Sequence, residues 1–276
     1  MATGTLASRR VRGLRSQVPA LVDAFRRNDL LLFASAISFQ ILTAVVPLAL
    51  FGLGLVAFFD IAELYSSDLR PRLSEQVDIP TFVVIDSTIE RILGEKQVFW
   101  VTLGGALAVW QLSGAVRAAM EVLNRVHEVE EERSWKDRFP RSILLAVVGT
   151  VLVFAAVAMV RLTPLLVGDP SAIVSVGVFI VRWGAAAALL VLFVGLLIRF
   201  GPDLRDQPLG WVSFGAVLVI AIWLAMSALF GVYLTQLASY GSVFGFLATF
   251  VVLTGYLYAS CITFVAGIQL DALARE

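Results

Sequence analysis

The chain contains 276 residues, of which 59% are hydrophobic and only 15% charged, and its 21 basic residues balance its 21 acidic residues. A soluble domain averages about 45–50% apolar and about 25% charged residues. This composition cannot cover a water-facing surface, so it predicts an integral membrane protein and excludes a disordered chain. The balanced charge gives no general attraction for nucleic acid. The single cysteine, Cys261, excludes a disulfide-stapled secreted fold.

Six apolar stretches approach or exceed the roughly 20 residues that a membrane-spanning helix needs. They predict an all-α fold, a single six-helix membrane domain over residues 30–272. We expect a cytoplasmic N-terminal segment (1–29) before this domain and a short tail (273–276) after it. The predicted spans are about 30–59, 98–116, 143–160, 173–198, 209–234 and 243–270.

Short amphipathic helices are expected at both membrane faces, where apolar residues repeat at helical spacing outside the spans. One set precedes the first span (Val18, Leu21, Val22 and Phe25), and another lies in 61–96 (Phe82, Ile85, Ile89 and Ile92). The densely charged stretch 117–138 is interpreted as a solvated helix and loop, with a docking surface for a partner as the alternative.

The distribution of lysine and arginine predicts the orientation of the chain. If the N-terminus is inside, the inner segments hold 15 basic residues and the outer segments 5. Because positive residues concentrate on the cytoplasmic side, we expect both termini in the cytoplasm.

Residues that could support enzymatic chemistry are scarce. The chain has one histidine, His127, and one cysteine, and none of the predicted spans contains a carboxylate. A metal site or a Cys–His nucleophile therefore cannot be assembled from these residues. We predict no enzyme activity, no bound metal and no cofactor.

Arg182 is the only charged residue well inside a predicted span. An ionised side chain in the hydrocarbon costs at least about 2.5–3.5 kcal/mol on insertion scales, so it normally faces protein or water. One interpretation is a cavity that binds an anionic solute. The alternative is an arginine that bonds helix-end carbonyls or extends toward the interface.

Other polar residues of the spans are candidates for a polar path through the bundle. They are Ser38 and Gln40 in the first span, Gln111 and Asn124 in and just after the second, and Ser242, Tyr258 and Gln269 at the start and along the sixth. The alternative is that they hydrogen-bond neighbouring helices in a plugged bundle, with Ser242 as a helix cap. The glycine pairs Gly52/Gly54 and Gly104/Gly105 predict close helix packing.

Several short motifs, taken in order, resemble the YihY/BrkB family of bacterial inner-membrane proteins. The similarity covers residues from about 20 to 272. The motifs are Ala36-Ile37-Ser38-Phe39 with Pro47, Ser113-Gly114-Ala115-Val116-Arg117, Leu123-Asn124-Arg125-Val126, Pro202, Phe230, Tyr233, Tyr240-Gly241-Ser242, Leu257-Tyr258-Ala259-Ser260 and Gly267-Ile268-Gln269-Leu270. The chain departs from the family at Gln40, Ala44, Tyr256 and Gln269. The family usually has glutamate at Gln269, and its loss argues against proton coupling there.

The resemblance implies six helices in a bacterial inner membrane with both termini inside, but no settled function. Members have been labelled a tRNA-processing ribonuclease, a label generally considered a misassignment, or virulence and serum-resistance factors. Transport has also been proposed. We expect a transporter or exporter of a small or amphipathic solute in the lipid bilayer, with Arg182 suited to an anionic one. The alternatives are a non-transporting scaffold and, least favoured, a hydrolase. A homo-oligomer is left open.

Overall fold

The computed structural model describes residues 19, 21–58, 65–66, 70–76, 79–94, 97–167, 172–203, 214–234 and 243–273. These residues form helices and connecting turns without any strand, which confirms the all-α prediction. The helices are α2 (Leu30–Phe58), α3 (Arg70–Gln76), α4 (Ile79–Gly94), α5 (Gln97–Val126), α6 (Trp135–Val167), α7 (Ala172–Phe200), α8 (Phe214–Val232) and α9 (Val243–Leu273).

Among the described residues, five helices are long and apolar enough to cross a membrane, and Ala221–Val232 within α8 is a shorter apolar helix. This is approximately consistent with the six predicted spans. Large apolar side chains on these helices are exposed, for example Leu32 at 66% and Val251 at 67%. In a membrane-embedded bundle these surfaces contact lipid.

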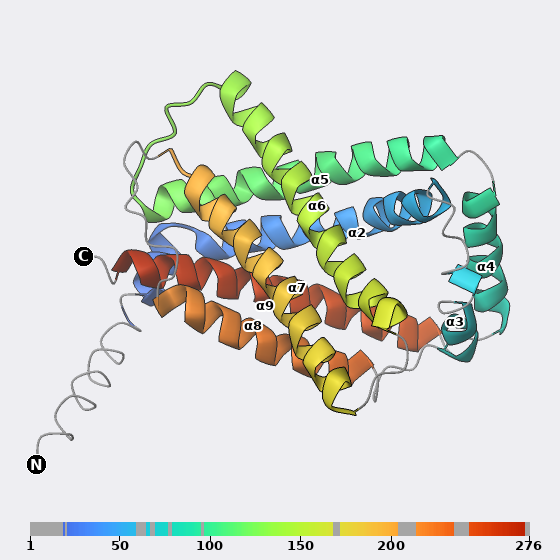
Figure 1. Cartoon of the computed structure of the whole chain (residues 1–276). Coiled ribbons are helices and arrows are strands. Elements are labelled where there is room, and N and C mark those ends of the chain that lie inside the picture. The colour runs from blue at the N-terminus through green and yellow to red at the C-terminus, as the bar shows by residue number, and fades with distance from the viewer. Residues whose placement is uncertain are drawn as a thin grey trace, which may run out of the picture.

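The antiparallel helices α2 and α5 form the central pair of the bundle (Figure 1). Helix α9 packs on α2, and α8 packs on α9. On the other side, α6 packs on α5, and α7 packs on α6. The beginning of α2 and the end of α9 lie together, at what we call the terminal end. The short helices α3 and α4 lie at the opposite end, which we call the α4 end.

Glycines set the close approach of α2 and α5. A Cβ added to Gly104 would lie 2.7 Å from the backbone nitrogen of Phe51, and one added to Gly54 would lie 2.9 Å from that of Val101. Since backbone atoms cannot move aside separately, only glycine fits at either position while the helices stay this close. The close packing predicted from these glycine pairs is confirmed.

The buried core cluster lies at the terminal end. Its fully buried side chains include Leu30 of α2, Met120 and Leu123 of α5, and Val265 of α9. Leu197 of α7 joins the same cluster. Leu145 and Ala146 of α6 belong to the same cluster, so five helices of the bundle are fixed to one another at this end.

The helix ends at the terminal end have identifiable causes. Helix α5 continues ten residues past the apolar stretch 98–116 and ends in a Schellman motif, in which Glu128 has a φ of 53°. The amide of Val129 donates to the carbonyl of Asn124 at 2.9 Å. Asp29, with a φ of 51°, similarly separates the helical residues 21–27 from α2. Aspartate tolerates this left-handed conformation better than most residues.

Candidate functional site

A cavity of about 300 Å³ lies between α2 and α9. We call it the α2–α9 groove. Four of its lining residues come from α2 and three from α9: Ser35, Ser38, Phe39, Leu42, Thr254, Gly255 and Tyr258. Two of the residues predicted to line a polar path, Ser38 and Tyr258, are therefore brought together here.

The groove offers few polar groups, and none of its lining residues is charged. The hydroxyls of Ser35 and Ser38 donate to the carbonyls of Leu32 and Ser35 of their own helix, at 2.7 and 2.9 Å. Their oxygens can still accept a hydrogen bond. The Tyr258 hydroxyl has no hydrogen-bond partner among the residues that the structure describes. The Thr254 hydroxyl likewise donates to the Phe250 carbonyl, at 2.8 Å, and can still accept. The groove thus combines apolar walls with one available donor and three further hydroxyl acceptors.

The remaining candidates on α2, α5 and α9 lie outside the groove. Gln40 packs against α5, where its side-chain amide fills the space beside Gly114. Gln111 is half-buried on α5. Gln269 is buried near the end of α9 and accepts a 3.3 Å hydrogen bond from Asn28. Ser242 lies outside the described residues.

Arg182 also lies away from the groove, on α7, which packs mainly on α6. Its guanidinium carbon stands 5.3 Å from the ring centroid of Phe179. Its Nε is buried without a hydrogen-bond partner, and the neighbouring Val181 and Trp183 are exposed. The structure therefore does not place Arg182 and the α2–α9 groove in one cavity.

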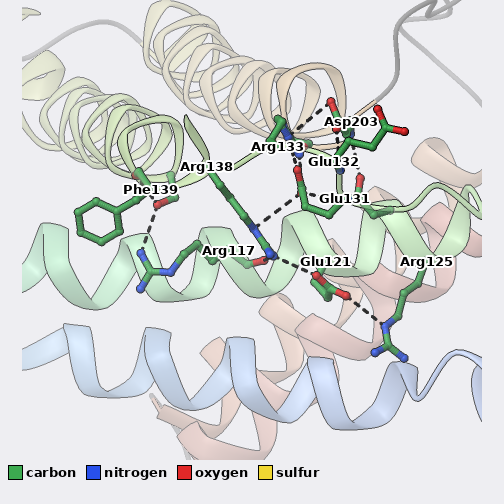
Figure 2. A network of polar contacts seen from close by, with 12 residues as sticks. Arg117, Glu121, Arg125, Glu131, Glu132, Arg133, Arg138, Phe139 and Asp203 are labelled. Atoms are coloured by element: carbon green, nitrogen blue, oxygen red, sulfur yellow. Dashed lines mark hydrogen bonds and ion pairs between the residues drawn. The ribbon is translucent and has the colours of Figure 1, made fainter. Parts of the chain in front are cut away.

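Asn124 takes part in a polar network at the terminal end. Figure 2 shows other members of this network, among them Glu131, Arg133 and Asp203. Its side chain is buried, at 2% exposure for the residue. Its Nδ2 donates to Glu131 at 2.8 Å, and its Oδ1 accepts from the backbone amide of Asp203 at 2.9 Å. One amide therefore joins the end of α5 to the α5–α6 loop and to the residues after α7.

Arg133 closes the same network. It binds Glu131 through two nitrogens, one of them at 2.7 Å, and donates to the carbonyl of Gly201 at 2.8 Å. Although burial raises the pKa of Glu131, its bonds to Arg133 and Asn124 and the charge of Arg138 hold that pKa below its usual value. The hydrogen bond to Glu131 and the charge of Asp203 raise the pKa of Arg133. Both groups are thus held in their charged forms.

Two further arginines connect α5 to its neighbours. Arg117 donates to Ser113 at 3.0 Å and to Ser142 of α6 at 3.2 Å, and its guanidinium lies 5.3 Å from the Phe139 centroid. Arg138 of α6 bridges back to Glu121 at 3.0 Å. On the opposite side of α5, Arg125 contacts Phe33 of α2 and pairs with Asp29 at 3.5 Å; both contacts bind α5 to the start of α2.

A second polar cluster lies at the α4 end and was missed by the sequence reasoning. Asp86 of α4 accepts hydrogen bonds from Tyr65 and Arg70, each at 2.7 Å. Burial and the Asp86 carboxylate raise the pKa of Tyr65. The sequence could have indicated this cluster, because Asp86 shares the apolar face of α4 with Phe82 and Ile89 at helical spacing. A carboxylate on that face needs a polar partner.

Two observations on the described residues concern a possible metal site and a possible histidine base. Among these residues, no three His, Cys, Asp or Glu side chains gather as metal ligands would. His127 caps the end of α5, with its Nδ1 2.8 Å from the carbonyl oxygen of Leu123.

Comparison with known proteins agrees with the sequence motifs. A sequence model described as "Virulence factor BrkB" matches residues 21–276. The chain is 26% identical to the ribonuclease-like protein YfkH of Bacillus subtilis (strain 168) over 250 residues, which cover 88% of this chain and 89% of that protein. It is 25% identical to a UPF0761 membrane protein of Alkalilimnicola ehrlichii over 265 residues, which cover 90% of this chain but only 56% of that protein. No solved structure matches the chain.

Three of the motifs that carry the resemblance meet in space. Ser113 and Arg117, Asn124 and Arg125, and the turn at Pro202 all belong to or adjoin the network at the terminal end. The family match over nearly the whole chain confirms the predicted resemblance. The chain belongs to the BrkB family of multi-pass membrane proteins, whose function is uncharacterised.

Proposed function

We propose that the protein transports an amphipathic solute across the bacterial inner membrane, with both termini in the cytoplasm, and that it is not an enzyme. The threefold excess of basic residues in the inner segments supports this orientation. The scarcity of groups for acid–base or metal chemistry supports a binding rather than a catalytic role.

The observation that carries the proposal is the α2–α9 groove. Its volume of about 300 Å³ lies at the lower end of the range of small-molecule sites. Apolar walls with one hydroxyl, that of Tyr258, that has no partner among the described residues suit a solute with one polar end and one apolar end. Ser38 supplies a second polar contact as a hydrogen-bond acceptor.

Arg182 is proposed as a separate anion contact on α7 rather than as part of the groove. Its unpartnered Nε and the absence of a carboxylate partner among the described residues support this role. In a thermal-shift assay, anionic solutes should raise the melting temperature of the wild-type protein, and Arg182→Leu should abolish that rise. The rise that uncharged amphiphiles produce should be the same in both proteins. If Arg182→Leu leaves every stabilisation unchanged, Arg182 has no role in solute binding.

Transport is tested in proteoliposomes loaded with a panel of fluorescent amphiphiles of each charge. Tyr258→Phe removes this hydroxyl from the groove. Tyr256→Phe is the matched control, because the Tyr256 hydroxyl contacts Ser227 of α8 at 2.8 Å and lies outside the groove. We expect flux through wild type and Tyr256→Phe, and slower flux through Tyr258→Phe.

The competing function is a scaffold that does not transport. A scaffold would also need the network of hydrogen bonds and ion pairs at the terminal end. No flux above protein-free liposomes for any amphiphile of the panel, with correctly folded protein, would favour the scaffold and refute the proposal.

A further inference from the structure

We propose that the α2–α9 groove binds the acyl chain of a membrane amphiphile, which enters sideways from the lipid rather than from water. This rests on the proposed function and names its substrate class. The groove, the exposure of its rim and the position of its Tyr258 hydroxyl carry the inference.

The groove opens on the lipid-facing surface of the bundle. On α2, the exposed residues Leu32, Ser35, Phe39 and Val46 and the half-buried Leu42 follow one helical stripe, and Phe39 is 63% exposed. On α9, exposed Leu247, Val251 and Thr254 lie on one stripe with Tyr258. Since both helices are long and apolar enough to span the membrane, the medium at the mouth of the groove is acyl chains.

The one lining hydroxyl without a hydrogen-bond partner among the described residues, that of Tyr258, lies at one end of the groove. Helix α2 runs away from the terminal end and α9 runs toward it, so Ser35 and Tyr258 lie nearest the terminal end. Leu42 and Thr254 mark the deeper end, about 10 Å from Ser35 at 1.5 Å per residue. The Thr254 hydroxyl donates to the Phe250 carbonyl, so, like those of Ser35 and Ser38, it offers only an acceptor. A bound amphiphile would therefore point its polar group toward the terminal end.

The register between α2 and α5 places this polar end at the membrane boundary. Gln40 lies beside Gly114, three residues before Arg117, where the charged part of α5 begins. Ser35, five residues nearer the terminal end, is therefore level with the stretch that holds Arg117 and Glu121. A lipid in the adjacent leaflet has its headgroup near this level and its chain deeper, as the groove requires.

The lining residues explain which part of the ligand is recognised. None of them is charged, so the chain rather than a headgroup charge should determine binding. The headgroup contributes one acceptor for the Tyr258 hydroxyl.

Gly255 provides a specific test, because a Cβ added there would meet no atom within 4 Å. Because Gly255 lines the groove, Gly255→Leu should fill it from α9, and its Cβ meets no neighbouring atom. The matched control is Gly184→Leu on α7, where an added Cβ also meets open space. Ser35→Leu, on the exposed rim, fills the groove from α2 and serves as a second variant if the first does not fold.

The probe is palmitate with a photoreactive diazirine in its chain, added to the purified protein in nanodiscs and mapped by peptide mass spectrometry. We expect labelling of residues 35–42 and 254–258 that excess unlabelled palmitate suppresses and butyrate does not. Gly255→Leu should lower it about tenfold, the loss that about 1.4 kcal/mol of binding free energy produces. Gly184→Leu should retain it.

Labelling that is spread evenly over the lipid-facing helices, or unchanged in Gly255→Leu and Ser35→Leu, would overturn the inference. So would competition by anionic palmitoyl-lysophosphatidylglycerol but not by the zwitterionic ethanolamine analogue, because recognition would then depend on charge. The flux assay separates the two proposals. Groove labelling without flux refutes transport alone, whereas flux of soluble amphiphiles without groove labelling refutes acyl-chain binding alone.

Discussion

Replacing Asn124 with aspartate removes one hydrogen bond of the network and sets two carboxylates against each other. Aspartate has nearly the shape of asparagine, and its oxygen can still accept from the Asp203 amide. On the other side, the Nδ2 donor that lies 2.8 Å from Glu131 becomes a carboxylate oxygen. The variant therefore tests whether this buried contact stabilises the terminal end.

The expected loss at neutral pH is large for a single-atom change. A hydrogen bond to a charged group contributes about 1.5–3 kcal/mol. Two carboxylates about 4 Å apart repel each other by about 4 kcal/mol at an effective dielectric constant of about 20. Arg133 and Arg138 offset part of this repulsion, so we expect the free energy of unfolding to fall by about 3–5 kcal/mol.

The pH dependence gives the variant a signature of its own. In the wild type the pKa of Glu131 is lowered on folding, so its contribution is present above its ordinary pKa and is lost as the pH falls through the lowered value. In Asn124→Asp the paired carboxylates raise one pKa on folding. When ionised at neutral pH, that group lowers the free energy of unfolding, and its protonation on acidification restores the lost stability. The difference in free energy of unfolding between wild type and Asn124→Asp should therefore decrease as the pH falls from neutral to about 5.

The assay is SDS-induced unfolding in mixed micelles, repeated across this pH range. Asn28→Asp is the control, because Asn28 donates only a 3.3 Å bond to the neutral Gln269; it should lose less than about 1.5 kcal/mol. If Asn124→Asp is as stable as wild type at neutral pH, or its loss does not change with pH, the network does not hold the terminal end as described.

Two further predictions use the same unfolding assay. Gly104→Ala should lose about 1–3 kcal/mol, because its Cβ would meet the Phe51 backbone, whereas Gly184→Ala, in open space, should lose nothing; equal effects would refute the close packing of α2 and α5. Asp86→Ala should lose about 1–3 kcal/mol by leaving the buried Tyr65 hydroxyl without its acceptor; an unchanged midpoint would mean that water replaces Asp86.

The sequence alone determined that this is a helical membrane protein, and it located the apolar helices. The physical reason is that the bilayer accepts only long apolar segments whose backbone groups bond internally. Glycines at close contacts were also readable, since Gly54 and Gly104 have few other uses inside an apolar helix. Family motifs identified the BrkB relationship before any contact was known.

Which polar residues meet was decided only by the tertiary structure. Asn124 resembled the other polar candidates, yet it binds Glu131 and Asp203, and the distance of 79 residues to Asp203 gives no local pattern. Ser38 and Tyr258 share a groove because of the α2–α9 register, while Arg182 lies on another helix pair.

The reason is the solvent. Between helices in lipid there is no hydrophobic force to mark the buried face, because acyl chains are as apolar as leucine. The apolar periodicity of a span therefore says little about which side faces a neighbour. Side-chain packing and a few polar bonds choose the helix pairs, and those choices placed the groove and the network.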